Sequence, residues 1–120
     1  MTATQGSAST EVLEGDILHT CASCGTHLAS AEDVVSKGFQ GKHGRAYLFS
    51  NVVNITLGEP AERELMTGTH TIVEVRCVSC KQYHGWKYIS ASHPNQSYKV
   101  DKFLLELKSM KKVDQRKSEA

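Results

Sequence analysis

The chain has 120 residues, 39% of them hydrophobic, and a mean hydropathy of −0.37. This length suits one domain, which would bury only about 60–68% of its unfolded surface and would therefore gain from a bound metal. Fourteen basic and 13 acidic side chains leave a net charge of +1, which argues against a general attraction to nucleic acid or to an anionic membrane. No apolar stretch approaches the roughly 20 residues of a membrane span.

Both ends of the chain are expected to be disordered tails. Residues 1–15 are rich in Ser, Thr, Ala and Gly and lack the features of a signal peptide. Residues 109–120 are basic, and a nuclear-import or docking signal is the alternative interpretation there. We therefore expect the protein in the nucleus, the cytoplasm or both, without a membrane. Thiols stay reduced in these compartments, which favours metal binding or catalysis over disulfides.

Between the tails, residues 16–108 are expected to form one domain, and its clearest patterns are those of strands. Segments rich in β-branched or aromatic residues are typical of strands, and four are present: 45–49, 52–57, 69–76 and 85–90. "GEPAEREL" (58–65) predicts one helical turn or a loop, because it contains glycine and proline. In "VDKFLLELKSM" (100–110) the apolar residues follow helical spacing, although some also alternate as in a strand.

All four cysteines belong to two Cys-x-x-Cys pairs, Cys21–Cys24 and Cys77–Cys80. This spacing lets one tight turn aim two thiolates at an ion about 2.3 Å from each sulfur, and two such turns complete a tetrahedron. Zinc is the expected metal because it suits sulfur ligands and is redox-inert. Four thiolates would fill its coordination sphere, so the ion would be structural.

The two cysteine turns differ in sequence and lie far apart. Gly25 follows Cys24 and allows a positive φ at little cost, whereas Lys81 stands at the equivalent place after Cys80. Fifty-two residues separate Cys24 from Cys77, so the ion would close a long loop and metal binding would be coupled to folding.

A redox function and a mixed ligand set are the alternatives. A thioredoxin-type dithiol needs a Cys-x-x-Cys pair at the start of a helix in a βαβ unit, and neither pair opens a convincing helix. His19, two residues before Cys21, and His84, four residues after Cys80, could each replace a thiolate. With four cysteines already present, neither histidine is needed.

Further motifs accompany the cysteine pairs in order: "GRAYLF" at 44–49, "VVN" at 52–54, "LMTG" at 65–68 and "GWKY" at 85–88. Together they resemble the Yippee-like proteins over residues 17–107. Members of that family usually carry an acidic residue and a glycine after a "YK" pair, where this chain has Val100 and Asp101.

The resemblance implies a mainly β fold in which two antiparallel sheets meet at an angle and are pinned at their apex by a four-cysteine zinc site. It also implies that "KFLLEL" (102–107) is a strand, against the helical spacing. The same fold class includes the ligand-binding domain of cereblon, a zinc-dependent methionine sulfoxide reductase and an RNA-end-sensing domain of an innate immune receptor. These proteins suggest three functions, namely ligand binding, catalysis and nucleic-acid binding, and each requires particular residues that can be sought in this sequence.

Catalysis and nucleic-acid binding are the weaker of these. Methionine sulfoxide reduction needs a nucleophilic cysteine beyond the metal ligands, and the chain has no fifth cysteine, so we do not expect an enzyme. "KGFQGKHGR" (37–45) offers Lys37, Lys42, His43 and Arg45 to a phosphate. A solvated hairpin loop explains the same charges, and we do not expect nucleic acid as a partner.

A ligand pocket is the third function. Trp86 matches in position one of the tryptophans that form the cage of cereblon, and Tyr88 shares its strand face. His70 and Ile72 lie near the places of the other cage residues. The alternative role for Trp86 is core packing against the cysteine turns.

We therefore predict a non-enzymatic domain with one structural zinc ion that acts as a protein-interaction or regulatory module. The resemblance suggests other proteins as partners, with ubiquitin ligase subunits as candidates, and a link to cell division. The alternative is a receptor for a small ligand or modified peptide at Trp86.

Overall fold

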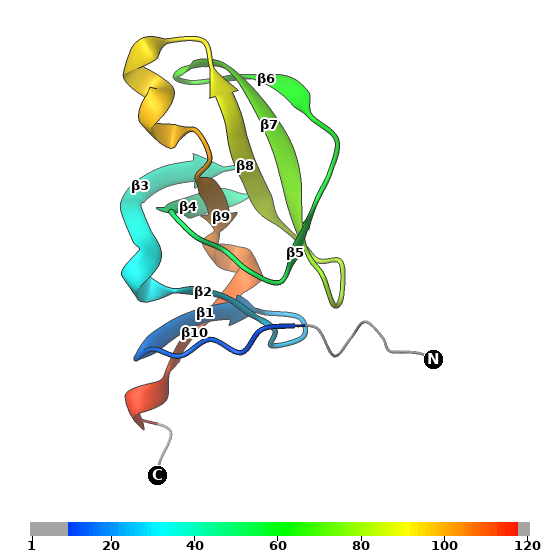
Figure 1. Cartoon of the computed structure of the whole chain (residues 1–120), viewed down its shortest axis with the longest axis vertical. Coiled ribbons are helices and arrows are strands. Elements are labelled where there is room, and N and C mark those ends of the chain that lie inside the picture. The colour runs from blue at the N-terminus through cyan, green and yellow to red at the C-terminus, as the bar shows by residue number, and fades with distance from the viewer. Residues whose placement is uncertain (1–9, 118–120) are drawn as a thin grey trace.

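The computed structural model describes residues 10–117, and antiparallel strands dominate it (Figure 1). Its strands are β1 (Ile17–Cys21), β2 (His27–Ser30), β3 (Val34–Gly41), β4 (Gly44–Phe49), β5 (Ile55–Leu57), β6 (Ala61–Leu65), β7 (Gly68–Cys77), β8 (Tyr83–Ala91), β9 (Phe103–Glu106) and β10 (Met110–Asp114). Short 3₁₀ helices connect or follow them: η3 (Ala31–Asp33), η4 (Pro94–Lys99), η5 (Leu107–Ser109) and η6 (Gln115–Lys117). Within residues 10–117, no helix is long and apolar enough to span a membrane.

The strands form two sheets. The smaller has the order β10-β1-β2, and the larger has the order β3-β4-β9-β8-β7-β5, with β6 also paired to β7. All neighbouring strands are antiparallel. In Figure 1 the small sheet lies at the lower end, and the β7–β8 hairpin rises from it at an angle. The predicted fold class, two antiparallel sheets meeting at an angle, is confirmed.

Two apolar clusters form the core, on opposite faces of the large sheet. The first joins the two sheets and consists of Cys21, Leu28, Ala29, Phe49, Val52, Val75, Cys77, Leu105 and Met110. The second consists of Ala46, Leu48, Ile72, Trp86, Tyr88 and Leu104. Trp86 therefore packs in the cluster without cysteines, and not against the cysteine turns.

β9 is a strand, as the resemblance implied, and the helix expected from apolar spacing over 100–110 is wrong at residues 103–106. β9 lies between β4 and β8. Leu104 and Leu105 are both fully buried and belong to different clusters. A strand that is buried on both faces shows no alternation, so periodicity alone cannot distinguish it from a buried helix.

The segment 58–65 contains the strand β6, where the sequence predicted a helical turn or a loop. β6 pairs with β7 from Ala61↔Ile72 to Leu65↔Gly68, and its three middle residues are exposed and charged. Charged side chains are common on edge strands, where they prevent further pairing. They also remove the apolar pattern by which a strand is recognised in a sequence.

The ordered structure extends into both expected tails. β10 lies within the segment 109–120 and pairs with β1 from Ile17↔Asp114 to Cys21↔Met110. Only Met110 of this strand is buried, so its sequence shows little apolar signal. At the other end, the backbone N–H groups of Glu11 and Leu13 donate to Asn54 and His27. Residues 1–9 and 118–120, which complete the expected tails, lie outside the described residues.

Candidate functional site

Each Cys-x-x-Cys pair occupies the turn of a hairpin, and the two turns have the same backbone hydrogen bonds. In each, the N–H of the first cysteine donates to the carbonyl oxygen five residues later, and the N–H four residues later donates back to the cysteine carbonyl. The N···O distances are 2.8 Å in the first turn and 2.9 Å in the second. The sequence spacing therefore encodes two equivalent turns.

The equivalence extends into the flanking strands, 56 residues apart in the chain. Both hairpins have a bulge at the same place, immediately before the turn. The equivalent residue pairs are His19↔Ala29 with Val75↔Gly85, and Thr20↔His27 with Arg76↔Tyr83. The chain thus repeats one hairpin unit, of which the Cys-x-Ser-Cys pattern is visible in the sequence.

The two turns face each other and bring the four sulfur atoms together. All four Sγ atoms lie within 4.8 Å of one another. The distances Cys21–Cys80 and Cys24–Cys77 are both 3.6 Å, and none of the four forms a disulfide. Tetrahedral zinc with Zn–S bonds of 2.3 Å needs sulfur atoms about 3.8 Å apart. The cluster therefore fits zinc, and it includes neither of the histidines considered as substitutes.

Side chains join the two turns in an equivalent way. Ser23 Oγ donates to Gln82 Oε1 at 3.0 Å, and the hydroxyl groups of Thr26 and Ser79 form a hydrogen bond of 3.1 Å. In each bond, the serine of one Cys-x-Ser-Cys turn contacts the residue that follows the other turn. The arrangement has approximate two-fold symmetry around the sulfur cluster, and the repeated serine is the sequence signal that would have predicted it.

The two cysteine turns differ at the residue that follows the second cysteine, as the sequence indicated. Gly25 has φ +81° and Lys81 has φ +68°, so the lysine adopts the left-handed conformation that glycine adopts in the first turn. Two contacts hold it there. Arg76 Nη1 donates to the Lys81 carbonyl oxygen at 3.1 Å, and Lys81 Nζ donates to the Val78 carbonyl oxygen at 3.3 Å.

The four thiols lie in different surroundings. Cys21 and Cys77 are buried, whereas Cys24 and Cys80 are exposed. Burial raises the pKa of Cys21 to about 12, and the hydroxyl group of Thr26 lowers the pKa of Cys24 to about 6. A metal ligand must be a thiolate, so a cation at this place would supply the charge that keeps Cys21 deprotonated.

Asn54 connects the cysteine hairpins to the N-terminal segment, which explains the "VVN" motif. Its Nδ2 donates to the carbonyl oxygens of His27 (2.7 Å) and Glu11 (2.9 Å), and its Oδ1 accepts from Glu11 N (2.7 Å). Its own carbonyl oxygen accepts from Val78 N in the second turn at 2.9 Å. One residue thus contacts both hairpins.

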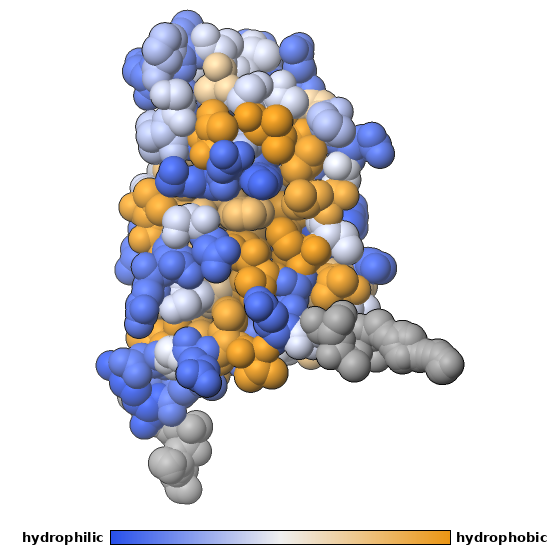
Figure 2. All heavy atoms as spheres, viewed as in Figure 1, coloured by the Kyte–Doolittle hydropathy of each residue, from blue (hydrophilic) through white to orange (hydrophobic). Residues whose placement is uncertain are grey.

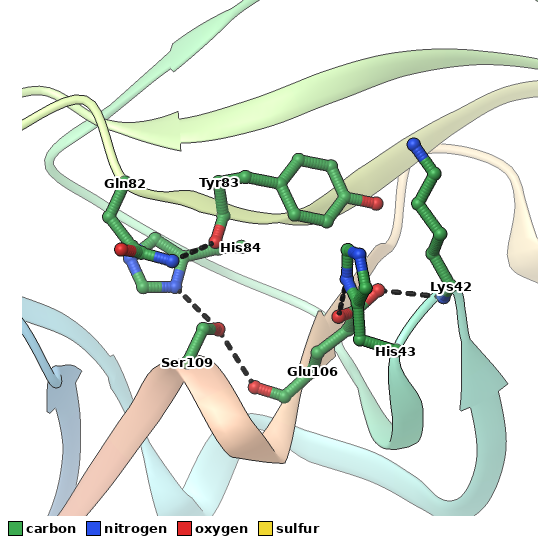
Figure 3. Close-up of polar contacts among 7 residues, drawn as sticks. All are labelled: Lys42, His43, Gln82, Tyr83, His84, Glu106 and Ser109. Carbon is green, nitrogen blue, oxygen red and sulfur yellow. Dashed lines mark hydrogen bonds and ion pairs between the residues drawn. The ribbon is translucent and has the colours of Figure 1, made fainter.

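A second polar cluster lies under the β3–β4 turn (Figure 3). The buried Glu106 carboxylate accepts from Lys42 N at 2.7 Å and lies 3.0 Å from His43 Nδ1. Gly41 leaves room for it, since a Cβ there would lie 2.6 Å from Glu106. Lys42 Nζ lies 5.6 Å from the ring centre of Tyr83. Lys42 and His43, which were considered as phosphate contacts in the sequence, hold the turn to Glu106 and Tyr83 in this cluster.

His84 and Ser109, also in Figure 3, form a hydrogen bond whose direction is unsuited to catalysis. Ser109 Oγ donates its single proton to the Glu106 carbonyl oxygen at 3.0 Å, so it accepts from His84 Nδ1 at 2.8 Å. Burial lowers the pKa of His84 to about 4. A catalytic histidine accepts the proton of the serine, whereas His84 donates one, so this pair holds β8 to η5.

A cavity of about 580 Å³ lies beside the second apolar cluster. Trp86 and Tyr88 line it, as the pocket hypothesis required. His70 and Ile72 are buried nearby but are not among its lining residues; His70 packs edge-on against Tyr88 at 5.3 Å.

Four further lining residues could not be identified from the sequence: Phe39, Met66, Tyr98 and Lys99. They come from β3, from the β6–β7 turn and from η4. Lysine is rarely buried, so a buried Lys99 could not be inferred from residue type or spacing.

A four-thiolate cluster that joins two antiparallel sheets defines a zinc-stabilised β domain. The comparisons with known proteins agree with this class. The chain belongs to the Yippee family, because the family described as "Yippee zinc-binding/DNA-binding /Mis18, centromere assembly" matches residues 17–120. The resemblance seen in the sequence is thus confirmed, and zinc is the cofactor of the domain.

Individual relatives support the same assignment. A yippee-like protein of Solanum tuberosum is 53% identical over 94 residues, which cover 78% of this chain and 72% of that protein. Yippee-like protein 3 of Homo sapiens is 47% identical over 92 residues, or 77% of each chain. The crystal structure of the Mis18 Yippee-like domain has a TM-score of 0.65 and covers 82% of this chain and 95% of that one. At 13% identity, this last similarity concerns the fold alone.

Proposed function

We propose that this domain is a non-enzymatic binding module for other proteins, with a structural zinc ion that keeps its surface in shape. The observation that carries the proposal is the apolar rim of the cavity. Met66 is 96% exposed and Tyr98 is 51% exposed, and both line the cavity. Exposed apolar side chains beside a concave site are typical of interaction surfaces.

The chemistry of the cysteines and of the Ser–His pair supports a role other than catalysis. All four cysteines of the chain lie in the sulfur cluster, so no thiol remains as a nucleophile. A zinc ion with four thiolate ligands has no open position for water or substrate. The hydrogen bond between His84 and Ser109 runs in the direction opposite to catalysis.

The finer roles stay predictions. A link to cell division is supported by the family description, which includes centromere assembly. Ubiquitin ligase subunits as partners, and a location in the nucleus, the cytoplasm or both, rest on the sequence resemblance.

A pair of matched variants tests the proposal. Met66→Asp places a charge on the rim, and Leu57→Asp places the same charge at a half-exposed apolar residue that does not line the cavity. Proteins cross-linked to the full-length chain in cells should be lost from Met66→Asp and retained by Leu57→Asp. If both variants keep the same partners as the unaltered chain, the rim is not the interaction surface.

The cavity itself favours a second candidate function, a receptor for a small ligand or a modified peptide at Trp86. Its volume of about 580 Å³ lies within the range of roughly 300–1,000 Å³ found for ligand sites. Aromatic side chains of Phe39, Trp86, Tyr88 and Tyr98 line it. Such walls suit a flat or apolar group.

A further inference from the structure

Lys99 is a buried lysine in the wall of this cavity, and only 3% of it is exposed. Its Nζ donates to Thr67 Oγ1 at 3.0 Å. Three aromatic rings surround the ammonium group, with centres at 5.1 Å (Phe39), 5.5 Å (Tyr88) and 5.9 Å (Tyr98). Among residues 10–117, no carboxylate forms an ion pair with it. Since buried lysines are rarely without a counter-charge, an anion from outside the chain would supply the charge that the described residues do not.

The indole N–H of Trp86 is a second unused donor in the same wall. Trp86 is 8% exposed, and its Nε1 is buried without a hydrogen-bond partner. Its ring packs edge-on against Tyr88, with the ring centres 6.2 Å apart, and no hydrogen bond joins the two side chains. Buried donors are almost always satisfied in folded proteins, so an acceptor is expected here.

We infer that the cavity binds a single carboxylate group carried by an apolar or aromatic moiety, with Lys99 Nζ and Trp86 Nε1 as the donors. The aromatic walls would cover the apolar part of the ligand. This inference rests on the second candidate function, the cavity as a ligand site, and adds the chemical class of the ligand.

The other charged group in the lining restricts the ligand further. Glu64 lies on β6 and is exposed, and its Oε1 accepts from Thr69 Oγ1 at 2.8 Å. The neighbouring His70 is buried and engaged, because its Nε2 forms a hydrogen bond of 3.0 Å with Thr67 Oγ1. The negative charge of Glu64 would repel a ligand with several anionic groups. One carboxylate facing Lys99 is therefore favoured over a phosphate or a dicarboxylate.

A carboxylate of this kind has two sources, a free aromatic acid or the C-terminus of a protein that ends in an apolar residue. The zinc-loaded full chain would be titrated with 3-phenylpropionate and with its neutral amide. The peptide acetyl-Gly-Phe would be used in the same way, with a free or an amidated C-terminus. Trp86 is the only tryptophan, so its fluorescence and its indole N–H resonance report on the cavity directly.

Both acids should bind at least about tenfold more tightly than their amides, and the indole N–H resonance should shift. Lys99→Met should abolish this preference, whereas Lys102→Met, at a lysine that does not line the cavity, should retain it. The comparison of acid with amide uses the unaltered chain, so it holds even if Lys99→Met fails to fold. Tighter binding of the peptide acid than of the free acid would identify a protein C-terminus as the source.

Two results would overturn the inference. Equal binding of acids and amides would leave the cavity as a ligand site but remove carboxylate recognition. No change in the indole resonance with any probe at millimolar concentration would remove the second candidate function as well. Neither result bears on the interaction at Met66, which the cross-linking experiment tests separately.

Discussion

Lys81 and Asp101 occupy backbone conformations that ordinarily favour glycine, with φ of +68° and +71°. Gly25 stands at the place equivalent to Lys81 in the other cysteine turn, and the resemblance described above implies a glycine where this chain has Asp101. A left-handed residue other than glycine costs about 1–2 kcal/mol. Hydrogen bonds hold both residues in place against this preference: those of Lys81 with Arg76 and Val78, and that of the Asp101 N–H to the Tyr88 carbonyl oxygen at 2.8 Å.

Replacing Lys81 by glycine should stabilise the zinc-loaded domain by about 0.5–1 kcal/mol, because the left-handed penalty exceeds the entropy that glycine adds to the unfolded state. Urea unfolding would measure the difference. Gly25→Ala is the matched control and should cost about 1 kcal/mol, since a Cβ there meets no atom within 4 Å and only the backbone is strained. A destabilised Lys81→Gly protein would mean that the contact of Lys81 Nζ with Val78 is worth more than the strain.

His84 makes the stability of the domain depend on pH. Burial lowers its pKa to about 4, below the ordinary value of about 6.5. The unfolded chain therefore binds more protons between these values, and stability should fall as the pH drops from about 6.5 toward 4, by up to about 3 kcal/mol. Unfolding curves of the unaltered chain and of His84→Gln would show it: the variant should lack this part of the pH dependence. If the free energy of unfolding had the same pH dependence in both proteins, His84 would not be its source.

Among the strands and turns, the contact between β8 and β9 is the tightest constraint. Gly85 has φ +152°, and a Cβ at this position would lie 1.9 Å from the carbonyl oxygen of Leu104. The two strands can approach each other only because residue 85 has no side chain. This explains why glycine precedes Trp86 in the "GWKY" motif.

Gly85→Ala should destabilise the domain by about 3 kcal/mol or more, because a backbone oxygen cannot move as a flexible side chain can. Thermal unfolding of the zinc-loaded protein would measure the loss. Gly38→Ala on β3 is the control, since a Cβ there meets nothing within 4 Å and its φ is not positive. It should be neutral or slightly stabilising. Equal melting temperatures for the two variants would show that β8 and β9 can separate without cost.

For the molecule as a whole, the sulfur cluster joins the two sheets, whose arrangement Figure 1 shows. Cys21 and Cys24 belong to the hairpin of the small sheet, and Cys77 and Cys80 to the β7–β8 hairpin of the large one. Apolar side chains also gather on the surface of the large sheet and of the region between the sheets, as Figure 2 shows. The metal site therefore lies at the junction where the first apolar cluster also joins the two sheets.

Removal of one ligand should unfold the domain. Cys77→Ser leaves a three-thiolate site and a polar group in the first apolar cluster, and it forfeits much of the binding free energy, about 10–16 kcal/mol for structural zinc in small peptides. Circular dichroism and zinc content would measure the effect, and a chelator should do the same to the unaltered chain. Ser79→Ala removes only a bond between the turns and should cost about 1 kcal/mol. A folded, cooperative Cys77→Ser protein would contradict a structural role for zinc.

The sequence by itself determined the features that depend on residue type and short spacing. The cysteine pairs predicted which four sulfur atoms come together, and the motifs predicted the family and its two-sheet fold. Three of the four expected strands lie within β4, β7 and β8, and the fourth segment, 52–57, contains β5. These predictions succeed because turn geometry and ligand chemistry are local properties of the chain.

Only the tertiary structure decided the features that depend on partners distant in the chain. β9 is a strand because β4 and β8 cover both of its edges, and β10 is a strand because β1 pairs with it. Trp86 lies in the second cluster because the face of β8, and not its distance from Cys80, sets its neighbours. Lys99 is buried because Phe39, Tyr88 and Tyr98 close around it. No local pattern encodes these contacts, since each joins residues from different elements of the fold.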